Sequence, residues 1–380
     1  MFRCNPFEPP RGGLSLYVHV PFCERKCKYC AFESSVPAPG DRELWLLSLE
    51  AELLWWKQRI GIPKISTCYV GGGTPTTLDG QQWRRLIEII DSYFRFDDDC
   101  EFTVEANPNS ISAEHLAMWR DWRVNRVSLG VQSFDDAELE MMGRLHSGIQ
   151  AYGAMSAAMA SGFSVSVDLM FGLPYQTFEG WYRNLKDAAK SGVHHISLYQ
   201  LSIEQGTPWE NMDRGTLSDG YWPYRWSQWY LPQKGFDQYE ISNFAKHGHE
   251  SKHNLNYWNE GEYLGVGPGA SGYLAGWRYK NIGTLSSYSK RLMNGIGAFE
   301  SGERLSEEVS AREAAVLALR TAAGVNKDSF IKRYGSASLE NLTALLSGFP
   351  KDLYCSDTHS ISLTKKGMRV ANLIWSELLL

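Results

Sequence analysis

The chain has 380 residues, of which 43% are hydrophobic and 21% charged, and its 38 lysines and arginines against 43 aspartates and glutamates give a net charge of −5. This length predicts one large domain with a smaller one appended, and it excludes a peptide or a minimal module. The abundant apolar residues exclude a disordered or fibrous protein, and a negative chain without a long basic run argues against nucleic acid as the main partner.

The first predicted feature along the chain is a short N-terminal lead, residues 1–13. It holds Pro6, Pro9 and Pro10 where a secretory signal would have an apolar core. No later apolar stretch reaches the roughly 18 residues that a membrane helix needs. We therefore expect a cytoplasmic protein without a transmembrane segment.

Short apolar runs that end in polar or glycine-rich turns predict buried strands, and helical patterns lie between them. The runs occupy residues 15–20, 67–71, 101–105, 126–131, 164–172 and 195–200. The helical patterns occupy residues 42–60, 81–94, 113–122, 137–142, 151–161 and 178–190, and Asp79 with Gln82 resembles a capping box. Strand and helix in alternation predict a parallel sheet with right-handed crossovers, either a partial barrel or a doubly wound sheet.

Polar or glycine residues stand at the C-terminal ends of these predicted strands, where parallel α/β folds gather their ligands. They are Gly71 to Thr74, Glu105, Gln132, Asp168 and Ser202. Six strand ends that meet at one mouth favour the open barrel. We therefore expect an α/β fold with a partial (β/α)6 barrel over residues 14–245.

The alternation weakens after this region, and an aromatic-rich segment at residues 222–230 precedes a glycine-rich stretch at residues 261–276. Trp222, Trp226 and Trp229 recur at helical spacing. We expect them to form a stripe facing the core, rather than a surface for stacking a porphyrin. Residues 246–304 are expected to be a connector.

The last part of the chain, residues 305–380, predicts a small C-terminal helical domain. Three helical patterns follow Ser306, and a polar hairpin at residues 355–363 precedes a final helix that starts at Lys365. A hairpin among helices is typical of a winged-helix-like domain.

Cys23, Cys27 and Cys30 follow the first predicted strand with the spacing C-x3-C-x2-C, which places three thiolates within reach of one centre. A cube of four irons and four sulfides normally takes four cysteines, so three ligands leave one iron open to another chelate. The alternative is a structural zinc site, which needs a fourth protein ligand that no nearby cysteine or histidine pair supplies. The spacing therefore favours a [4Fe-4S] cluster. The seven cysteines form an odd set in a chain without an export signal, which disfavours a disulfide framework.

Together with Gly71-Gly72-Gly73-Thr74-Pro75, this cysteine motif resembles the radical S-adenosylmethionine (SAM) superfamily. Within it, the chain is similar to the HemW and HemN group of heme chaperones and coproporphyrinogen-oxidase-like proteins. The segments that carry the likeness are residues 17–23, 104–108, 128–134, 168–174 and 253–258. They are spread over nearly the whole chain.

The resemblance implies a [4Fe-4S] cluster, SAM and heme as cofactors. It implies that cluster-bound SAM contacts Tyr17, Tyr29, Gly72 and Glu105. A second SAM site in the coproporphyrinogen enzymes corresponds to Gly73, Thr74, Gln132, Arg144 and Asp168, with Ser202 a weaker match. An arginine can hold a carboxylate through two hydrogen bonds, and an aspartate can accept from a hydroxyl or an ammonium group. Taken singly, each of these residues could instead be a turn residue or part of a surface ion pair.

The branch within the group is indicated by Phe32. The oxygen-independent coproporphyrinogen enzymes have a further cysteine two residues after the third, and here that position is Phe32. An aromatic residue there resembles the heme-chaperone branch, which implies binding of heme and its transfer to an acceptor protein. An electron donor for the cluster is a further implied partner.

Two enzymatic functions remain as alternatives. One is an oxygen-independent coproporphyrinogen III oxidase, or dehydrogenase, of porphyrin biosynthesis, which Phe32 argues against. The other is a HemN-like methyltransferase that uses two SAM molecules. No catalytic residue is assigned for either.

His253 is the candidate heme ligand, because imidazole is a common axial ligand of heme iron and Tyr257 and Trp258 beside it offer flat apolar faces. The alternative is a histidine that is hydrogen-bonded within a loop.

Overall fold

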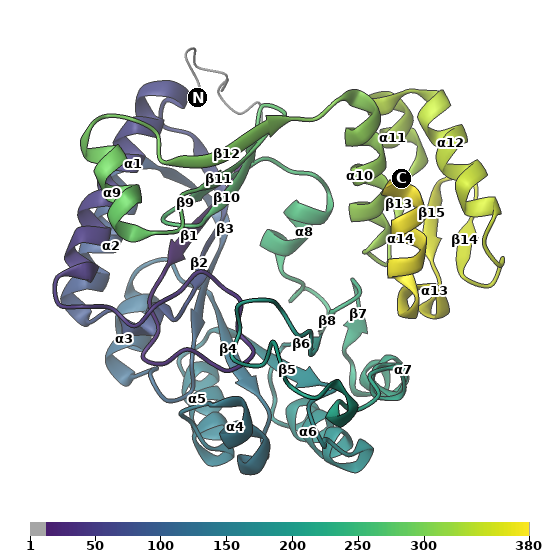
Figure 1. Cartoon of the computed structure of the whole chain (residues 1–380), viewed down its shortest axis with the longest axis horizontal. Helices are drawn as coiled ribbons and strands as arrows, with labels where there is room; N and C mark the ends of the chain where they lie inside the picture. The colour runs from purple at the N-terminus through teal and green to yellow at the C-terminus, as the bar shows by residue number, and fades with distance from the viewer. Residues whose placement is uncertain (1–12, 380) are drawn as a thin grey trace.

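The computed structural model describes residues 13–379, and its main feature is a large curved sheet (Figure 1). Six parallel strands form the middle of this sheet in the order of the chain. They are β1 (Leu14–Val20), β2 (Lys64–Gly72), β3 (Arg95–Ala106), β4 (Arg126–Gln132), β5 (Ser164–Phe171) and β6 (His195–Gln200). Each strand that the apolar runs predict is confirmed, and most of their buried apolar side chains belong to the main hydrophobic core.

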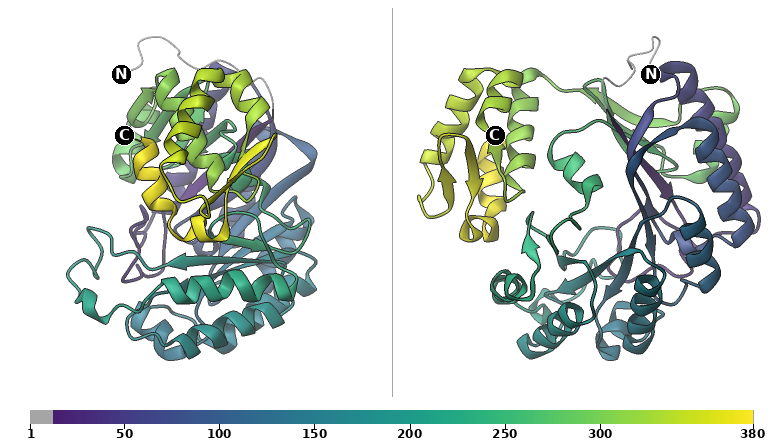
Figure 2. Two further views of the ribbon diagram at one scale, coloured as in Figure 1. Left: turned by 90° about the vertical axis from the view of Figure 1, so that its right-hand side faces the viewer. Right: turned by 180° about the vertical axis from the view of Figure 1, so that it is seen from behind.

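Helices cover the outer face of the six strands, as the right-hand view in Figure 2 shows. They are α1 (Asp41–Ile60), α2 (Gly80–Tyr93), α3 (Ala113–Asp121), α4 (Asp136–Met142), α5 (Gly148–Ala160) and α6 (Phe178–Lys190). The capping box is confirmed, because the Asp79 side chain accepts from Gln82 N and the Gln82 side chain accepts from Asp79 N. Strand and helix therefore alternate as an open (β/α)6 barrel, the predicted fold class.

Short strands extend the open sheet at both edges. On the β6 side lie β8 (Asn243–Ala245) and β7 (Asp237–Gln238), and on the β1 side lie β9 (Tyr263–Val266), β10 (Ser271–Leu274), β11 (Trp277–Asn281) and β12 (Phe299–Arg304). β9 runs parallel to β1, and β10 to β12 are antiparallel. The segment 246–304, for which the sequence predicts a connector, thus contributes four strands together with α8 (Lys252–Trp258) and α9 (Leu285–Met293).

The predicted tryptophan stripe lies on α7 (Tyr221–Tyr230), but it does not face the core. Trp222 and Trp229 are 55% and 56% exposed, and only Trp226 is half-buried. The smaller Ser227 is buried instead, and Trp181 on α6 donates its Nε1 proton to Ser227 Oγ at 3.2 Å. The expectation of a core-facing stripe is therefore wrong for two of the three tryptophans.

The C-terminal domain has a hydrophobic core of its own, separate from the core of the sheet. Its helices are α10 (Glu307–Leu319), α11 (Lys327–Tyr334), α12 (Ser336–Ser347), α13 (Lys365–Arg369) and α14 (Ala371–Leu379). A small sheet of β13 (Val325–Asn326), β15 (Ser360–Leu363) and β14 (Tyr354–Ser356) includes the predicted hairpin. Figure 1 shows this domain across from β1 and β9, with α8 between the two. Among the described residues, no helix is long and apolar enough to cross a membrane.

Glu52 on α1 is a buried carboxylate that joins α1 to the extended edge of the sheet. It accepts hydrogen bonds from Gly267 N at 2.8 Å, Asn281 Nδ2 at 2.7 Å and Tyr288 Oη at 2.5 Å. Burial raises the pKa of Glu52 from its ordinary 4.5 to about 7, although these hydrogen bonds oppose the shift. The folded chain therefore holds a proton at Glu52 more tightly than the unfolded chain does.

We predict from this difference how pH changes the effect of Glu52→Gln. Because the folded-state pKa is the higher one, the contribution of Glu52 to stability falls as pH rises from 4.5 to 7 and is constant above that. A glutamine does not titrate, so the stability of the wild type relative to Glu52→Gln should fall by up to about 3 kcal/mol over this range. Urea unfolding from pH 4.5 to pH 8 measures the free energy of unfolding of both proteins. A difference between the two that stays constant over this pH range would contradict the account.

Candidate active site

A cavity of about 380 Å³ opens at the C-terminal ends of the parallel strands. The loop after β1, the turn after β2 and the ends of β3 to β6 each contribute to its wall. The residues that sequence analysis singled out and that line it are Cys23, Cys27, Tyr29, Cys30, Phe32, Gly72, Gly73, Thr74, Glu105, Gln132, Arg144, Asp168 and Ser202. Tyr17 and His253 are not among its lining residues.

The loop that carries the three cysteines is held by backbone hydrogen bonds at several points. Cys23 N donates to Ser35 O at 3.0 Å, and Lys28 N donates to Met142 O at 3.1 Å. The Arg25 guanidinium donates to the carbonyl oxygens of Gly143 and Arg144. These contacts fix a loop without regular secondary structure against the linker between α4 and α5.

The three thiols are half-buried on the wall of the cavity, and two of them accept hydrogen bonds. Thr74 Oγ1 donates to Cys23 Sγ at 3.6 Å, and Arg144 Nη1 donates to Cys27 Sγ at 3.4 Å. Burial raises the pKa of the Cys30 thiol, which favours the neutral form of this side chain in the absence of a cation. A bound metal group would reverse that preference, because metal ligation requires the thiolate.

The glycine turn after β2 packs closely against the cysteine loop. Gly73 N donates to Val20 O at 2.8 Å, and Thr74 N donates to Phe22 O at 2.7 Å. A Cβ atom at Gly73 would lie 2.4 Å from Phe22 O, and Gly72 has a φ of 110°. The glycines are therefore required by the approach of the protein's own chain, in addition to the approach of a ligand that the sequence suggests.

Two carboxyl groups face the cavity from neighbouring parts of the sheet. Glu105 at the end of β3 accepts from Tyr69 Oη at 2.6 Å and from Gly72 N at 3.0 Å. Burial raises its pKa to about 7, and the negative charge of Asp168 on β5 adds to the shift. Burial likewise raises the pKa of Asp168 to about 6. A ligand that brings a positive charge or hydroxyl donors would favour the ionised form of both groups.

Arg144 is already engaged inside the protein, which differs from the expected role of a free carboxylate clamp. Its Nη2 atom donates to Asn107 Oδ1 and to Gly130 O, both at 2.6 Å. Its Nε atom is buried and has no partner among the described residues. Beside it, Gln132 has a φ of 65°, a left-handed conformation that is strained for a residue other than glycine and is often found at functional sites.

Tyr17, one of the residues expected to contact SAM, does not line the first cavity in this structure. Its hydroxyl is hydrogen-bonded to His19 Nδ1 at 2.9 Å, and burial raises its pKa well above the usual range. Tyr17 lines a second cavity instead. Its position on β1 is three residues before the strand ends at Val20, which places the side chain below the mouth of the barrel.

His253, the candidate heme ligand, is hydrogen-bonded inside the protein in this structure. The side chain is 1% exposed, and both of its ring nitrogens are occupied. Nδ1 is hydrogen-bonded to Thr67 Oγ1 at 2.8 Å, and Nε2 is hydrogen-bonded to Tyr257 Oη at 2.7 Å. Burial lowers the pKa of His253 to about 3, so the ring is neutral. His253 connects β2 to α8 and fixes the hydroxyl of Tyr257.

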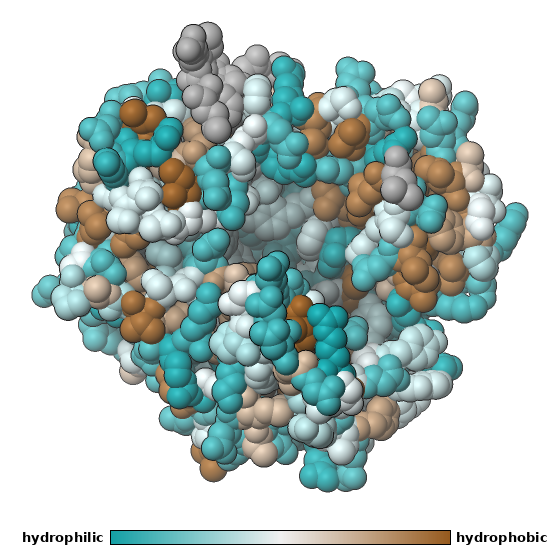
Figure 3. All heavy atoms as spheres, viewed as in Figure 1, coloured by the Kyte–Doolittle hydropathy of each residue, from teal (hydrophilic) through white to brown (hydrophobic). Residues whose placement is uncertain are grey.

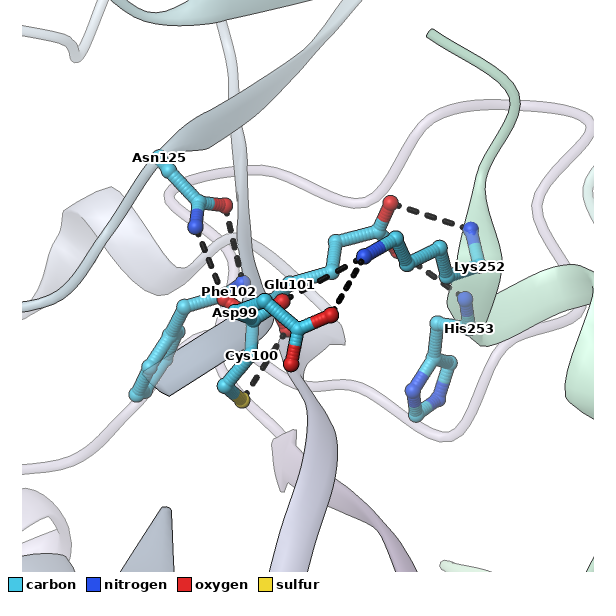
Figure 4. A network of polar contacts seen from close by, with 7 residues as sticks. All are labelled: Asp99, Cys100, Glu101, Phe102, Asn125, Lys252 and His253. Carbon is cyan, nitrogen blue, oxygen red and sulfur yellow. Dashed lines mark hydrogen bonds and ion pairs between the residues drawn. The ribbon is translucent and has the colours of Figure 1, made fainter. Parts of the chain in front are cut away.

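Figure 4 shows the contacts that hold α8 in place, and they come from Glu101, a residue that sequence analysis missed. Glu101 on β3 accepts from Lys252 N at 3.0 Å and from His253 N at 2.9 Å, so its carboxylate satisfies the first amides of α8. The only sequence signal is a charged residue at the start of an otherwise apolar run. Its role depends on a contact between segments about 150 residues apart.

A second cavity, of about 830 Å³, lies between the β1, β9, β10 and β11 part of the sheet and α10 of the C-terminal domain. Figure 3 shows the corresponding hollow in the face of the molecule. Its aromatic lining residues are Tyr17, Phe32, Tyr257, Trp258, Tyr263 and Tyr273. Arg278 and Lys280 also line it. Phe32, whose side chain is 67% exposed, lines both cavities and marks where they adjoin.

Comparison with known proteins identifies a matching superfamily and several similar proteins. The radical SAM superfamily matches residues 17–195. The heme chaperone HemW of Bacillus subtilis is 36% identical over 96% of this chain and 99% of that protein. The heme chaperone HemW of Mycobacterium tuberculosis strain H37Rv is 34% identical over the full length of both chains.

A solved structure resembles the fold over nearly the whole chain. Coproporphyrinogen III oxidase (HemN) from Escherichia coli, a radical SAM enzyme, superposes with a TM-score of 0.86 at 23% sequence identity. The likeness covers 98% of this chain and 90% of the oxidase. At this level of identity it shows a shared fold.

The packing of the glycine turn generates a prediction for two glycine substitutions. Gly73→Ala brings a methyl group against Phe22 O and should destabilise the protein by about 1–3 kcal/mol. Gly153→Ala, on α5, has no atom within 4 Å of the new Cβ and should stabilise the helix by about 0.5–1 kcal/mol. Urea unfolding compares the two, and equal shifts in the same direction would show that the contact at Gly73 is unimportant.

Proposed function

This chain belongs to the HemW family of radical SAM proteins, and from that premise we propose that it is a heme chaperone, which binds heme and passes it to an acceptor protein. In this proposal the first cavity holds a [4Fe-4S] cluster and SAM, and the second cavity holds heme. The observation that carries the proposal is the pair of adjoining cavities, one lined by three thiols and the other by aromatic rings. The acceptor, a donor of electrons to the cluster, and a cytoplasmic location are parts of the same proposal.

The donor set of the first cavity fits an iron-sulfur cluster. Cys23, Cys27 and Cys30 share one wall of the cavity on a loop that is fixed to its surroundings. No three His, Cys, Asp or Glu side chains within residues 13–379 converge as they would around a single metal ion. That finding is compatible with a cluster, because its ligands bind separate irons. Three thiolates would leave the fourth iron open to SAM, and a bound cluster would supply one-electron reduction of that ligand.

The other groups of the first cavity fit the polar parts of SAM. The Glu105 and Asp168 carboxylates can accept from ribose hydroxyls or from the amino group, and a cationic ligand would lower both raised pKa values. Apart from Tyr17, the residues that the family resemblance divides between two SAM sites line one cavity of about 380 Å³. We therefore propose one bound SAM, held on the Glu105 side of the cavity near the cysteines.

The second cavity fits a flat, apolar ligand with acidic groups. Its volume of about 830 Å³ lies within the range of roughly 300–1,000 Å³ that small-molecule and cofactor sites occupy. Tyr257, Trp258 and Tyr263 supply aromatic surface, and Arg278 and Lys280 supply positive charge for the two heme propionates. Both cations have glutamate partners in this structure, which the propionates would have to replace. His253 acts here as a positioning residue, because it holds the Tyr257 hydroxyl at the cavity.

Phe32 favours the chaperone over the coproporphyrinogen oxidase. The position that carries a further cysteine in the oxidases carries an apolar ring here, and this ring stands between the two cavities. The structural likeness to HemN shows the fold alone.

Heme binding to the second cavity predicts different outcomes for three variants. Trp258→Ala removes ring surface and should weaken hemin binding about tenfold. His253→Ala should weaken it to a similar extent by releasing Tyr257, while the Soret maximum of the bound hemin stays at its wild-type position. Trp222→Ala, on the outward face of α7, should bind hemin normally. Anaerobic hemin titrations measure all three, and a Soret shift in His253→Ala would instead identify the imidazole as the axial ligand.

The alternative function has a direct test in product analysis. Coproporphyrinogen III, incubated without air with the reconstituted protein, SAM and a reductant, should remain unchanged. Stoichiometric formation of protoporphyrinogen would overturn the chaperone proposal in favour of the oxidase. A methylated porphyrin together with S-adenosylhomocysteine would favour the methyltransferase.

A further inference from the structure

The outer surface of the molecule carries a groove that neither proposed cofactor site uses. It has a volume of about 520 Å³ and lies between α7 of the sheet domain and α13 of the C-terminal domain, which are neighbours in Figure 1. Trp222, Trp226 and Trp229 line it from α7. We call this surface the tryptophan groove. Because it touches both domains, a ligand there would contact both at once.

Much of the aromatic lining of the tryptophan groove is exposed to solvent. Trp222 and Trp229 are each more than half exposed, and Phe178 at the start of α6 is 48% exposed in the same groove. Monomeric proteins rarely expose a contiguous set of large apolar side chains, and such patches mark interaction sites. Tryptophan is also among the residues that contribute most to binding energy in protein interfaces.

Three cations surround these rings, and none of them has a carboxylate partner among the described residues. Arg225 stacks over the Trp222 ring at 5.0 Å and makes no hydrogen bond within residues 13–379. Lys365 Nζ donates to Gln228 O at 3.0 Å, and Arg369 Nε donates to Gln228 Oε1 at 2.7 Å. No aspartate or glutamate lines the groove. The side chains are thus partly oriented, while their positive charge is uncompensated in a chain of net charge −5.

We propose that the tryptophan groove docks an acidic segment of a partner protein, in which carboxylates flank an aromatic or large aliphatic side chain. The apolar side chain would lie against Trp222 and Trp229, and the carboxylates would pair with Arg225, Lys365 and Arg369. Charge complementarity of this kind gives specificity and speeds association. Three cations in one short groove do not form the extended track that a nucleic-acid backbone needs.

The tryptophan groove lies where the sheet domain and the C-terminal domain meet. α13 packs in the same hydrophobic core as α10, which lines the second cavity, whereas α7 belongs to the sheet domain on the other side. A partner in the groove would therefore bridge the two domains that enclose the second cavity. That this partner receives heme rests on the proposed function, whereas the docking itself does not.

The experiment measures binding of a synthetic peptide to the full-length chain that carries its cluster. The probe is a fluorescein-labelled 12-residue peptide of glutamates around a central phenylalanine, read by fluorescence anisotropy at low salt. One control peptide has lysine in place of glutamate, and a second has glycine in place of the phenylalanine. The variants are Arg225→Glu, Trp222→Ala and, as a control of equal charge change, Arg84→Glu on the exposed face of α2.

We expect saturable binding of the peptide that carries both the glutamates and the phenylalanine, and of neither control peptide. Arg225→Glu, Trp222→Ala and a higher salt concentration should each weaken this binding about tenfold. Arg84→Glu should bind like the wild type. Failure of the acidic peptide to bind, or equal binding of the lysine peptide, would overturn the proposal. Displacement of the peptide by hemin, or tighter binding of a labelled oligothymidylate, would also overturn it and identify a porphyrin or nucleic-acid surface. Hemin binding in the second cavity is measured separately, so failure here leaves the heme proposal intact.

Discussion

The contact between the cysteine loop and the glycine turn determines where the three thiols lie. The loop follows β1 and the turn follows β2, and two backbone hydrogen bonds join them through Gly73 N and Thr74 N. A side chain at Gly73 would collide with Phe22 O, so the two segments can approach only through glycine. Because parallel strands end at one edge of the sheet, this contact also brings the thiols into the same cavity as the Glu105 and Asp168 carboxylates. The chemistry of the first cavity thus depends on the close approach of two neighbouring strand ends.

The second cavity depends on a longer chain of contacts. Glu101 satisfies the first amides of α8, His253 then connects this helix to β2, and the same ring fixes Tyr257 at the cavity wall. The C-terminal domain closes the opposite side through α10. Phe32 belongs to the cysteine loop and, like Ala31 before it, lines both cavities, so the proposed cluster and heme sites adjoin at this loop. In a heme chaperone, this arrangement would let the state of one site affect the other.

Local patterns were enough to predict the barrel, and they also singled out the three cysteines that line the first cavity. The six parallel strands are continuous apolar runs, and the Asp79 cap and the cysteine spacing are short-range signals. Other features depend on distant contacts. β9 and β10 have four residues each and contain Gly265 and Gly272, so alternation could not reveal them. The partner of His253 is Thr67, 186 residues away, which no motif around the histidine indicates. The tryptophan spacing on α7 predicted one face of a helix, but not which face Trp181 would bury.

The central claim is that three thiols hold a four-iron cluster with one iron open to SAM in the first cavity. The most direct measurement is electron paramagnetic resonance of the anaerobically reconstituted and reduced protein, with iron and sulfide analysis, before and after SAM is added. The account predicts four irons and four sulfides per chain and a reduced-cluster signal that changes when SAM binds. Protein that takes up no sulfide, or a cluster signal that SAM leaves unchanged, would contradict it.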